Sequence, residues 1–183
     1  MSNEAPAMQV SRTQLKDALT VRPVAHDDPR GLFKETYVAS RYRQAGIPDV
    51  FVQDSISVSR RHVLRGLHCD PQMSKLVQVL RGEAFDVIVD ARRHSESFGK
   101  WQCFELSESN GLQVYVPAGF LHGFLALSDD VIFSYKQSAE YAPGREIGVI
   151  WNDPDLGVEW PLSAPPLVSP KDQRNARFTE AFV

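Results

Sequence analysis

The sequence contains little cysteine and no long apolar run. The two cysteines in its 183 residues, Cys69 and Cys103, lack a CxxC spacing. A disulfide between them is possible but not needed, and we expect free thiols. Even the longest apolar runs, such as the one at residues 85–90, are too short to cross a bilayer. Residues 1–17 also lack the apolar core of a signal peptide, and we therefore expect a cytoplasmic protein without membrane contacts.

An excess of positive charge is also absent. The formal net charge is −3, so we expect no bulk attraction to nucleic acid or to acidic lipid. Hydrophobic residues make up 43% of the chain and charged residues 23%, the balance of an ordinary globular protein. The length fits one domain over residues 1–183. We expect its N-terminal segment, about 1–45, and its extended, proline-containing tail, about 152–183, to pack on a central barrel.

Helical patterns are weak, whereas β-patterned runs fill the middle of the chain. Short helices are expected at residues 11–19 and 38–46, the second ended by Gly46 and Pro48. Short strands are expected at residues 50–59, 62–69, 75–82, 84–91, 100–107, 112–117, 122–128 and 131–138. Turn-forming residues separate several of them, at 81–83, 108–111 and 128–130. This succession of short strands predicts an all-β sandwich or closed barrel.

One histidine motif narrows the fold. The stretch PAGFLHGF, residues 117–124, is similar to the second sequence motif of cupins, which implies a cupin-like double-stranded β-helix, or jelly-roll barrel, with a few short helices. The first cupin motif of metal enzymes has a second histidine, but here His68 is followed by Cys69 and Asp70, and Lys75 lies just beyond. Because metal sites need three or four protein ligands, we predict that the protein binds no metal.

A longer series of stretches resembles the dTDP-4-dehydrorhamnose 3,5-epimerase family, from about residue 21 to residue 178. They read PRGLFKETY, FVQDSISVS, VLRGLH, KLVQVLRGEAFDVIVDARRHSESFGKW, PAGFLHGFLALS, FSYKQSAEYAP, WNDPDLGVEWPL and VSPKDQ. The resemblance implies an isomerase that acts without a cofactor on a dTDP-linked 4-keto-6-deoxy sugar and forms a homodimer. Enzymes that invert only C3 or only C5 share the same motifs, so this alternative stays open.

The implied reaction has clear chemical needs. A 4-keto sugar has acidic protons at C3 and C5, because loss of either gives an enolate on the same oxygen. Inversion requires a base on one face, an acid on the other, and a hydrogen-bond donor or positive charge at that oxygen. The resemblance implies that His68 is the base, that Asp172 orients it, that Tyr135 is the acid and that Lys75 lies near the keto oxygen.

The other matches of the resemblance are ligand contacts. They are Arg30, Glu35, Gln53, Asp54, Ser55, Arg65, His122, Tyr141, Glu146 and Lys171. Arg30 and Glu35 are expected to reach the nucleotide of the partner subunit. Tyr141 is expected to stack on the thymine ring, and arginine and lysine side chains to neutralise the pyrophosphate.

The residues alone also fit plainer interpretations. His68 and Tyr135 could be hydrogen-bonded core residues, and Arg30, Glu35 and the other charged residues could be solvated surface groups. Lys75 is the least ordinary, because it shares a strand face with Val77 and Val79 and an inward lysine is costly unless paired. A metal-dependent cupin enzyme and a non-catalytic sugar-binding barrel are the competing functions. Asp86 lies within an expected strand, and the sequence indicates no partner for it.

Overall fold

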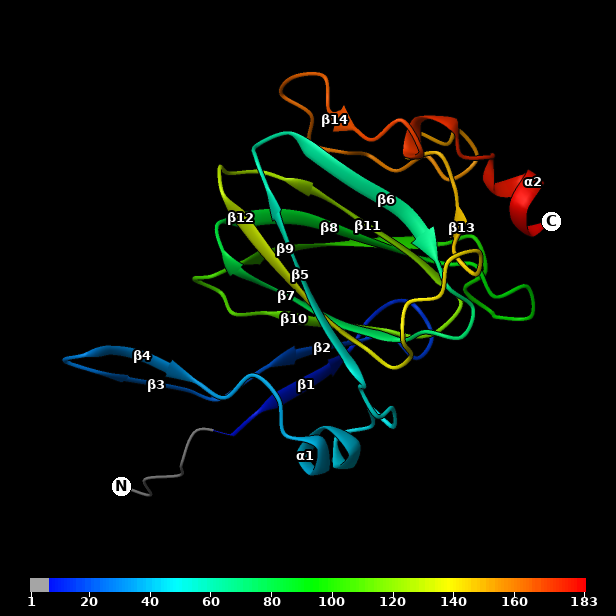
Figure 1. Cartoon of the computed structure of the whole chain (residues 1–183). Coiled ribbons are helices and arrows are strands. Elements are labelled where there is room, and N and C mark those ends of the chain that lie inside the picture. Colours follow the sequence, from blue (N-terminus) through cyan, green and yellow to red (C-terminus); the bar gives the residue numbers. More distant parts are fainter. Residues whose placement is uncertain (1–6) are drawn as a thin grey trace.

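Two mostly antiparallel sheets face each other in the computed structural model, which describes residues 7–183 (Figure 1). The first sheet has the order β1 (Gln9–Arg12), β2 (Leu19–Arg22), β10 (Gln113–Val116), β7 (Lys75–Arg81), β12 (Val131–Gln137) and β5 (Gln53–Ser59). The second has the order β13 (Ile147–Gly148), β6 (Val63–Cys69), β11 (Phe120–Ala126), β8 (Glu83–Asp90) and β9 (Trp101–Ser107), and β14 (Leu167–Val168) pairs with β6. The chain passes repeatedly from one sheet to the other, so the predicted all-β jelly-roll fold is confirmed.

The predicted strands of residues 50–138 correspond to β5–β12, with bounds within a few residues of those expected. The helix predicted at residues 38–46 is also present as α1 (Ala39–Gln44), and Gly46 follows it with a left-handed φ of 96°. The prediction of a helix at residues 11–19 is wrong. This segment forms β1, a turn and β2, because β2 pairs with β1 on one side and β10 on the other. Such non-local pairing outweighs a weak helical preference.

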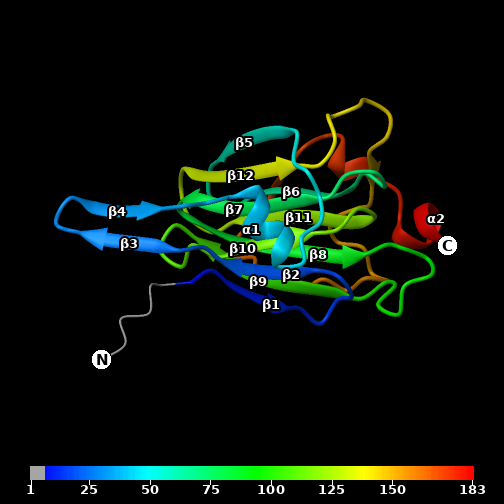
Figure 2. The same cartoon turned by 90° about the horizontal axis from the view of Figure 1, so that it is seen from below.

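The sequence also did not predict the hairpin of β3 (Ala25–Asp28) and β4 (Gly31–Lys34), the short strands β13 and β14, or the two short helical elements of the tail. The β3–β4 hairpin projects from the sheets in both views (Figures 1 and 2). The tail contains the 3-10 helix η1 (Asp172–Arg174) and the helix α2 (Phe178–Phe182). The first six residues of the expected N-terminal segment lie outside the described residues.

Three apolar clusters hold these layers together. Between the sheets, the inner faces of the strands bury a cluster that includes Phe124 and Phe133, whose rings stack at 4.2 Å. The tail covers the outer face of the second sheet with Trp160, Phe178 and Phe182. Helix α1 covers the outer face of the first sheet in the same way. None of the helices in the described part of the chain is long and apolar enough to span a membrane.

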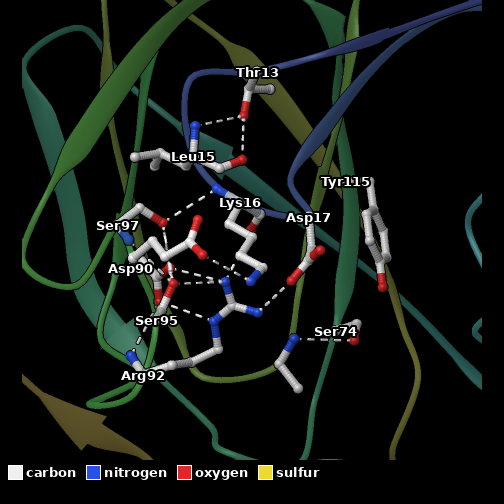
Figure 3. Close-up of polar contacts among 12 residues, drawn as sticks. Thr13, Leu15, Lys16, Asp17, Ser74, Asp90, Arg92, Ser95, Ser97 and Tyr115 are labelled. Carbon is white, nitrogen blue, oxygen red and sulfur yellow. Dashed lines mark hydrogen bonds and ion pairs between the residues drawn. The ribbon is translucent and has the colours of Figure 1, made fainter.

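A buried carboxylate fixes the turn between β1 and β2. Figure 3 shows Asp90 accepting hydrogen bonds from Arg92, Ser95 and Ser97, and the guanidinium of Arg92 continues to the carboxylate of Asp17. Asp90 is fully buried, so its charge is stabilised by these donors rather than by water. The network therefore anchors the N-terminal turn to the end of β8.

Candidate active site

A cavity of about 470 Å³ opens between the two sheets, lined by β5, β7 and β12 on one side, by β6 and β11 on the other, and by the tail. Most of the expected site residues line this one cavity. They are Gln53, Ser55, Arg65, His68, Lys75, His122, Tyr135, Tyr141, Glu146, Lys171 and Asp172. Residues from five strands, the loop after β12 and the tail therefore meet at one place.

A close approach of two glycines sets the direction of the side chains on β6. Gly66 has a left-handed φ of 120°, and a Cβ atom on it would lie 2.6 Å from the Cα of Gly123 on β11. The register of the two strands shifts there, between His122 and Phe124. Strict alternation would put Leu64 and His68 on one face. With the irregularity, Leu64 and Leu67 pack in the cluster beneath the tail, while His68 lines the cavity opposite His122.

His68 is held by a carboxylate from the tail. Its Nε2 lies 2.6 Å from Oδ1 of Asp172, and the amide of Gly66 donates to the other oxygen at 3.4 Å. Burial alone would raise the pKa of Asp172, but hydrogen bonding and the charge of His68, with the bonds from Gly66 and Ser169, outweigh it and lower the pKa. With Nε2 bound in this way, Nδ1 is the ring nitrogen without a hydrogen-bond partner among residues 7–183. It lies 3.9 Å from Oε2 of Glu146, so it has no direct hydrogen bond to that group.

Tyr135 points inward from β12 with Val131 and Phe133, as the alternation predicts. Its hydroxyl lies 3.4 Å from that of Ser57. Burial raises the pKa of Tyr135 to about 12, and Ser57 and Arg65 offset only part of this effect. The phenol therefore carries its proton at neutral pH and can donate it.

Lys75 stands at the start of β7 and lines the same cavity. Burial lowers the pKa of its ammonium, and the charge of Glu146 opposes this in part. We find no hydrogen bond or ion pair from the Lys75 ammonium to any residue of 7–183. The cation is thus available to an oxygen of a bound ligand.

The structure gives Asp86 the partner that the sequence did not indicate. Its Oδ1 lies 2.7 Å from Nε2 of His122, and both side chains are buried. The ring of His122 also packs edge-on to Tyr135, with the centroids 6.1 Å apart. Asp86 sits on the inner face of β8 between the core residues Ala84 and Ile88. The sequence signal for this pair was a charged residue on an otherwise apolar strand face, the same kind of signal that marked Lys75.

A cluster of hydrogen-bonded polar side chains at the start of β5 borders the cavity. The side chains of Gln53, Ser55 and Gln137 bond to one another at 2.8–3.1 Å, and Gln53 accepts a bond of 2.9 Å from the backbone of Tyr141. Arg65 donates to Ser59 at 3.1 Å. Gln137 was missed by sequence reasoning, although its period-two spacing from Tyr135 places it on the same face.

Three expected site residues lie outside the cavity of this chain. Arg30 is on the projecting hairpin and pairs with Asp28. Glu35 pairs with Arg41 just before α1. Asp54 points to the opposite face of β5 from Gln53 and bonds to Lys136.

The residues present do not form a metal site of ordinary kind. Within residues 7–183, no three or more His, Cys, Asp and Glu side chains are grouped so that they could hold an ion. His68 and His122 are each paired with a carboxylate on Nε2, and Lys75, on the facing sheet, lines the same cavity. The cavity instead combines a carboxylate-oriented imidazole, a protonated phenol and a free ammonium.

Comparison with known proteins identifies the family. The sequence model described as dTDP-4-dehydrorhamnose 3,5-epimerase matches residues 12–180. The enzyme of that name from Pseudomonas aeruginosa is 43% identical over 177 residues, which cover 95% of this chain and 98% of that one. The dTDP-4-dehydrorhamnose 3-epimerase of Streptomyces niveus is 39% identical over 88% of this chain and 79% of its own.

A solved structure gives the same result. The dTDP-6-deoxy-D-glucose-3,5-epimerase of Legionella pneumophila, crystallised with dTDP-4-keto-L-rhamnose, superposes with a TM-score of 0.91 at 41% identity and covers 94% of each chain. Matches of this extent include every strand that lines the cavity. The chain therefore belongs to the dTDP-4-dehydrorhamnose 3,5-epimerase family.

Proposed function

We propose that this protein is an isomerase that inverts C3 and C5 of dTDP-4-keto-6-deoxyglucose to give dTDP-4-keto-rhamnose, without a metal or redox cofactor. The observation that carries the proposal is the placement of the His68–Asp172 pair, the Tyr135 hydroxyl and the Lys75 ammonium around one cavity. These groups supply a base, an acid and a cation. Proton transfer next to a carbonyl needs no more than this.

The first step uses the oriented imidazole. Nδ1 of His68 removes the proton from C3 or C5, and the carboxylate of Asp172 stabilises the imidazolium that forms. Negative charge develops on the C4 oxygen, where the ammonium of Lys75 stabilises it. Because the cavity is partly desolvated, this attraction is stronger than it would be in water.

The second step uses the phenol. Tyr135 donates its proton to the opposite face of the same carbon, which inverts the centre. Its raised pKa keeps the proton in place until the enolate is present. Exchange with solvent then returns a proton to Tyr135 and removes one from His68, so the pair can act at the second carbon.

The remaining cavity residues bind the nucleotide sugar in this proposal. Arg65 and Lys171 supply positive charge for the pyrophosphate. Tyr141, which is exposed at the rim, stacks on the thymine ring. The other ligand contacts are Gln53, Ser55, His122 and Glu146.

We also propose a homodimer built by strand exchange. Arg30 and Glu35 do not reach the cavity of their own chain, and the β3–β4 hairpin projects away from the sheets (Figure 2). The hairpin exposes Leu32 and Phe33, and the edge strand β5 exposes Ile56 and Val58. Exposed strand edges with apolar side chains are surfaces that association covers. A second copy would thus receive the hairpin, with Arg30 and Glu35, beside its own cavity, and Asp54 would lie at the contact.

An epimerase for C3 alone, or for C5 alone, is the second candidate, because a relative named as a 3-epimerase matches most of the chain. Incubation with dTDP-4-keto-6-deoxyglucose in deuterated water, followed by proton NMR, tests both. Deuterium at C3 and C5 with inversion is the expected result. Deuterium at one carbon identifies the second candidate, and exchange at neither contradicts the proposal.

A chelator separates the proposal from a metal-dependent cupin enzyme. Within residues 7–183, neither histidine of the cavity belongs to a group of three or more possible metal ligands, so EDTA should leave turnover unchanged. Loss of activity with EDTA, restored by Zn²⁺, Fe²⁺ or Mn²⁺, would require a metal in the mechanism.

A further inference from the structure

We infer that the ion pair of Asp70 and Arg145 is a positioning device that holds the loop of residues 138–146 over the cavity and thereby sets the affinity for the nucleotide sugar. The inference rests on the proposed function for the identity of that ligand. Neither residue lines the cavity, and nothing in the proton-transfer steps uses them. Asp70 follows β6 two residues after His68, whereas Arg145 precedes β13.

Asp70 is an anchored, buried carboxylate. Its side chain is 8% exposed, and both oxygens are engaged. Oδ1 accepts a bond of 2.9 Å from the amide of Gln72, which closes the turn between β6 and β7. Oδ2 accepts a bond of 3.1 Å from Nε of Arg145. The short turn thus holds the acceptor rigidly, ready for the arginine of a different loop.

Arg145 connects the carboxylate of Asp70 to the backbone of its own loop. Its Nη2 donates to the carbonyl of Glu140 at 2.7 Å, and its backbone amide donates to the carbonyl of Ala142 at 3.2 Å. One guanidinium therefore ties the turn of residues 140–145 to the carboxylate of Asp70. A second tie lies at the start of the loop, where Ser74 and Ser138 exchange bonds of 2.8 and 3.0 Å.

The loop is held by polar contacts rather than by apolar burial. None of the residues from 138 to 146 is buried, so the hydrophobic effect contributes little to its conformation. Gly144 at its tip has a left-handed φ of 90° and no atom near the position of a Cβ. Polar contacts must then define the loop. Ser138 at its start and Arg145 at its end bind the buried residues Ser74 and Asp70, and the amide of Tyr141 donates to Gln53.

Two cavity residues depend on this loop. Tyr141 is 55% exposed and lies between Glu140 and Arg145, the two residues that the guanidinium joins. Glu146 follows Arg145 directly, and its carboxylate lies between His68 and Lys171. When the ion pair is broken, we expect Tyr141 and Glu146 to sample positions away from the cavity. Binding then includes the cost of ordering the loop.

The test uses Asp70→Asn, Arg145→Gln and the double variant. Asn at position 70 keeps an oxygen for the amide of Gln72, so the turn should remain closed while the charge is lost. We expect each single change to raise the Kd for dTDP and the KM for the sugar nucleotide about fivefold to tenfold, with kcat changed less than about twofold. The double variant should bind dTDP no more weakly than either single variant does, because the two changes remove the same interaction. Arg145→Lys should restore part of the affinity.

Hydrogen exchange supplies a readout that needs no ligand. Amides of residues 138–146 should exchange faster in Asp70→Asn and Arg145→Gln, while those of β8 should not change. Arg61→Gln is the matched control, since it removes a surface ion pair with Asp129 far from the loop and should alter neither exchange nor binding. Unchanged loop exchange, or faster exchange with unchanged Kd and KM, would overturn the inference. A wild-type protein that binds dTDP but shows no epimerisation would instead contradict the proposed function alone.

Discussion

His68 and Asp172 meet at 2.6 Å although 104 positions separate them in the chain. The contact joins the end of β6 to the 3-10 helix of the tail, so the tail completes the cavity as well as covering the second sheet. A base with one ring nitrogen bound to a carboxylate and the other free is oriented for proton transfer. Loss of the His68 imidazole should therefore affect proton transfer rather than nucleotide binding.

Replacing His68 by Asn should abolish most turnover and leave nucleotide binding intact. General-base removal costs about 10²–10⁴-fold in rate, or roughly 3–5 kcal/mol of barrier. The Kd for dTDP, measured by calorimetry, should stay near that of the wild type because the proposed nucleotide contacts lie elsewhere. Near-normal solvent exchange at C3 and C5 in this variant would show that another group is the base.

The alkaline side of the pH profile should report Lys75 rather than Tyr135. Burial lowers the pKa of Lys75 below its ordinary value of 10.5, so its ammonium loses the proton at a lower pH than a surface lysine does. Burial raises the pKa of Tyr135 to about 12, so the phenol stays protonated over the same range. The rate of solvent exchange into the substrate should therefore fall with rising pH below 10.5. It should fall in the same range in Tyr135→Phe.

Lys75→Arg is the control for this assignment. A guanidinium keeps its proton at high pH, so the alkaline decline should move upward even if the rate itself is lower. Deprotonation of Lys75 at rising pH should lower the activity but raise the stability of the folded protein. A buried lysine with a lowered pKa destabilises the folded state while it is charged, and this cost is relieved as the pH rises through the native value. A decline that does not move in Lys75→Arg would exclude Lys75 as its cause.

Asp90 should matter for stability and not for catalysis. Burial raises its pKa, but the bonds from Arg92, Ser95 and Ser97 outweigh this and lower it (Figure 3). Its stabilising contribution is therefore present above the ordinary value of 3.8 and is lost as the pH falls through the lower native value. Asp90→Ala leaves these donors without their acceptor, and we expect a loss of about 3–5 kcal/mol in urea unfolding at pH 7.

The matched control is Asp129→Asn, which removes an exposed ion pair with Arg61 and should cost less than about 1 kcal/mol. Asp90 does not line the cavity, so folded Asp90→Ala protein should keep its kcat. A loss of kcat without a loss of stability would mean that the network serves the site.

The proposed dimer predicts a solution mass of two chains. Replacing Phe33, which is exposed on the hairpin, by Asp should yield monomers in sedimentation analysis and raise KM, because Arg30 and Glu35 would no longer reach a partner's cavity. Asp27→Asn on the same hairpin is a polar control that should remain dimeric. A monomeric wild type with full activity at micromolar concentration would contradict strand exchange.

The barrel was predictable because its signals are local. Alternating residues such as Val131, Phe133 and Tyr135 reveal the inner face of a strand, and turn residues such as Gly82 mark where the chain reverses. The segment of residues 11–19 was misassigned because β2 is held in the sheet by pairing with β10, which no local pattern reveals, and β1 in turn pairs with β2. The C-terminal helix α2 is equally dependent on packing, through Phe178 and Phe182.

The site was predictable as a set of residues but not as a geometry. The family resemblance indicated His68 and Asp172, yet the pairing of Asp86 with His122 depends on the register of β8 and β11. The role proposed for Asp70 depends on a loop that begins after β12. Contacts of this kind join strands that are distant in sequence, so they appear only when the sheets are assembled.

Tyr135→Phe should separate proton removal from inversion. The phenyl ring keeps the packing against Phe133 and His122, so stability should change by no more than one hydrogen bond, about 0.5–1.5 kcal/mol. His68 and Lys75 remain, so the enolate still forms, but the opposite face lacks its acid. His68 can then return a proton, or a deuteron taken from solvent, to the face from which it came. Deuterium should therefore enter the substrate with its original configuration, while formation of the epimer falls.

Proton NMR of one sample in deuterated water distinguishes the outcomes, since exchange with retention and exchange with inversion give different sugar signals. Ser57→Ala is the matched control. It removes the 3.4 Å neighbour of the Tyr135 hydroxyl but leaves the acid in place, and it should keep the wild-type ratio of inversion to exchange. Inversion by Tyr135→Phe at the wild-type rate would assign the acid to another group, and Tyr141, on the rim of the same cavity, would be the next side chain to replace.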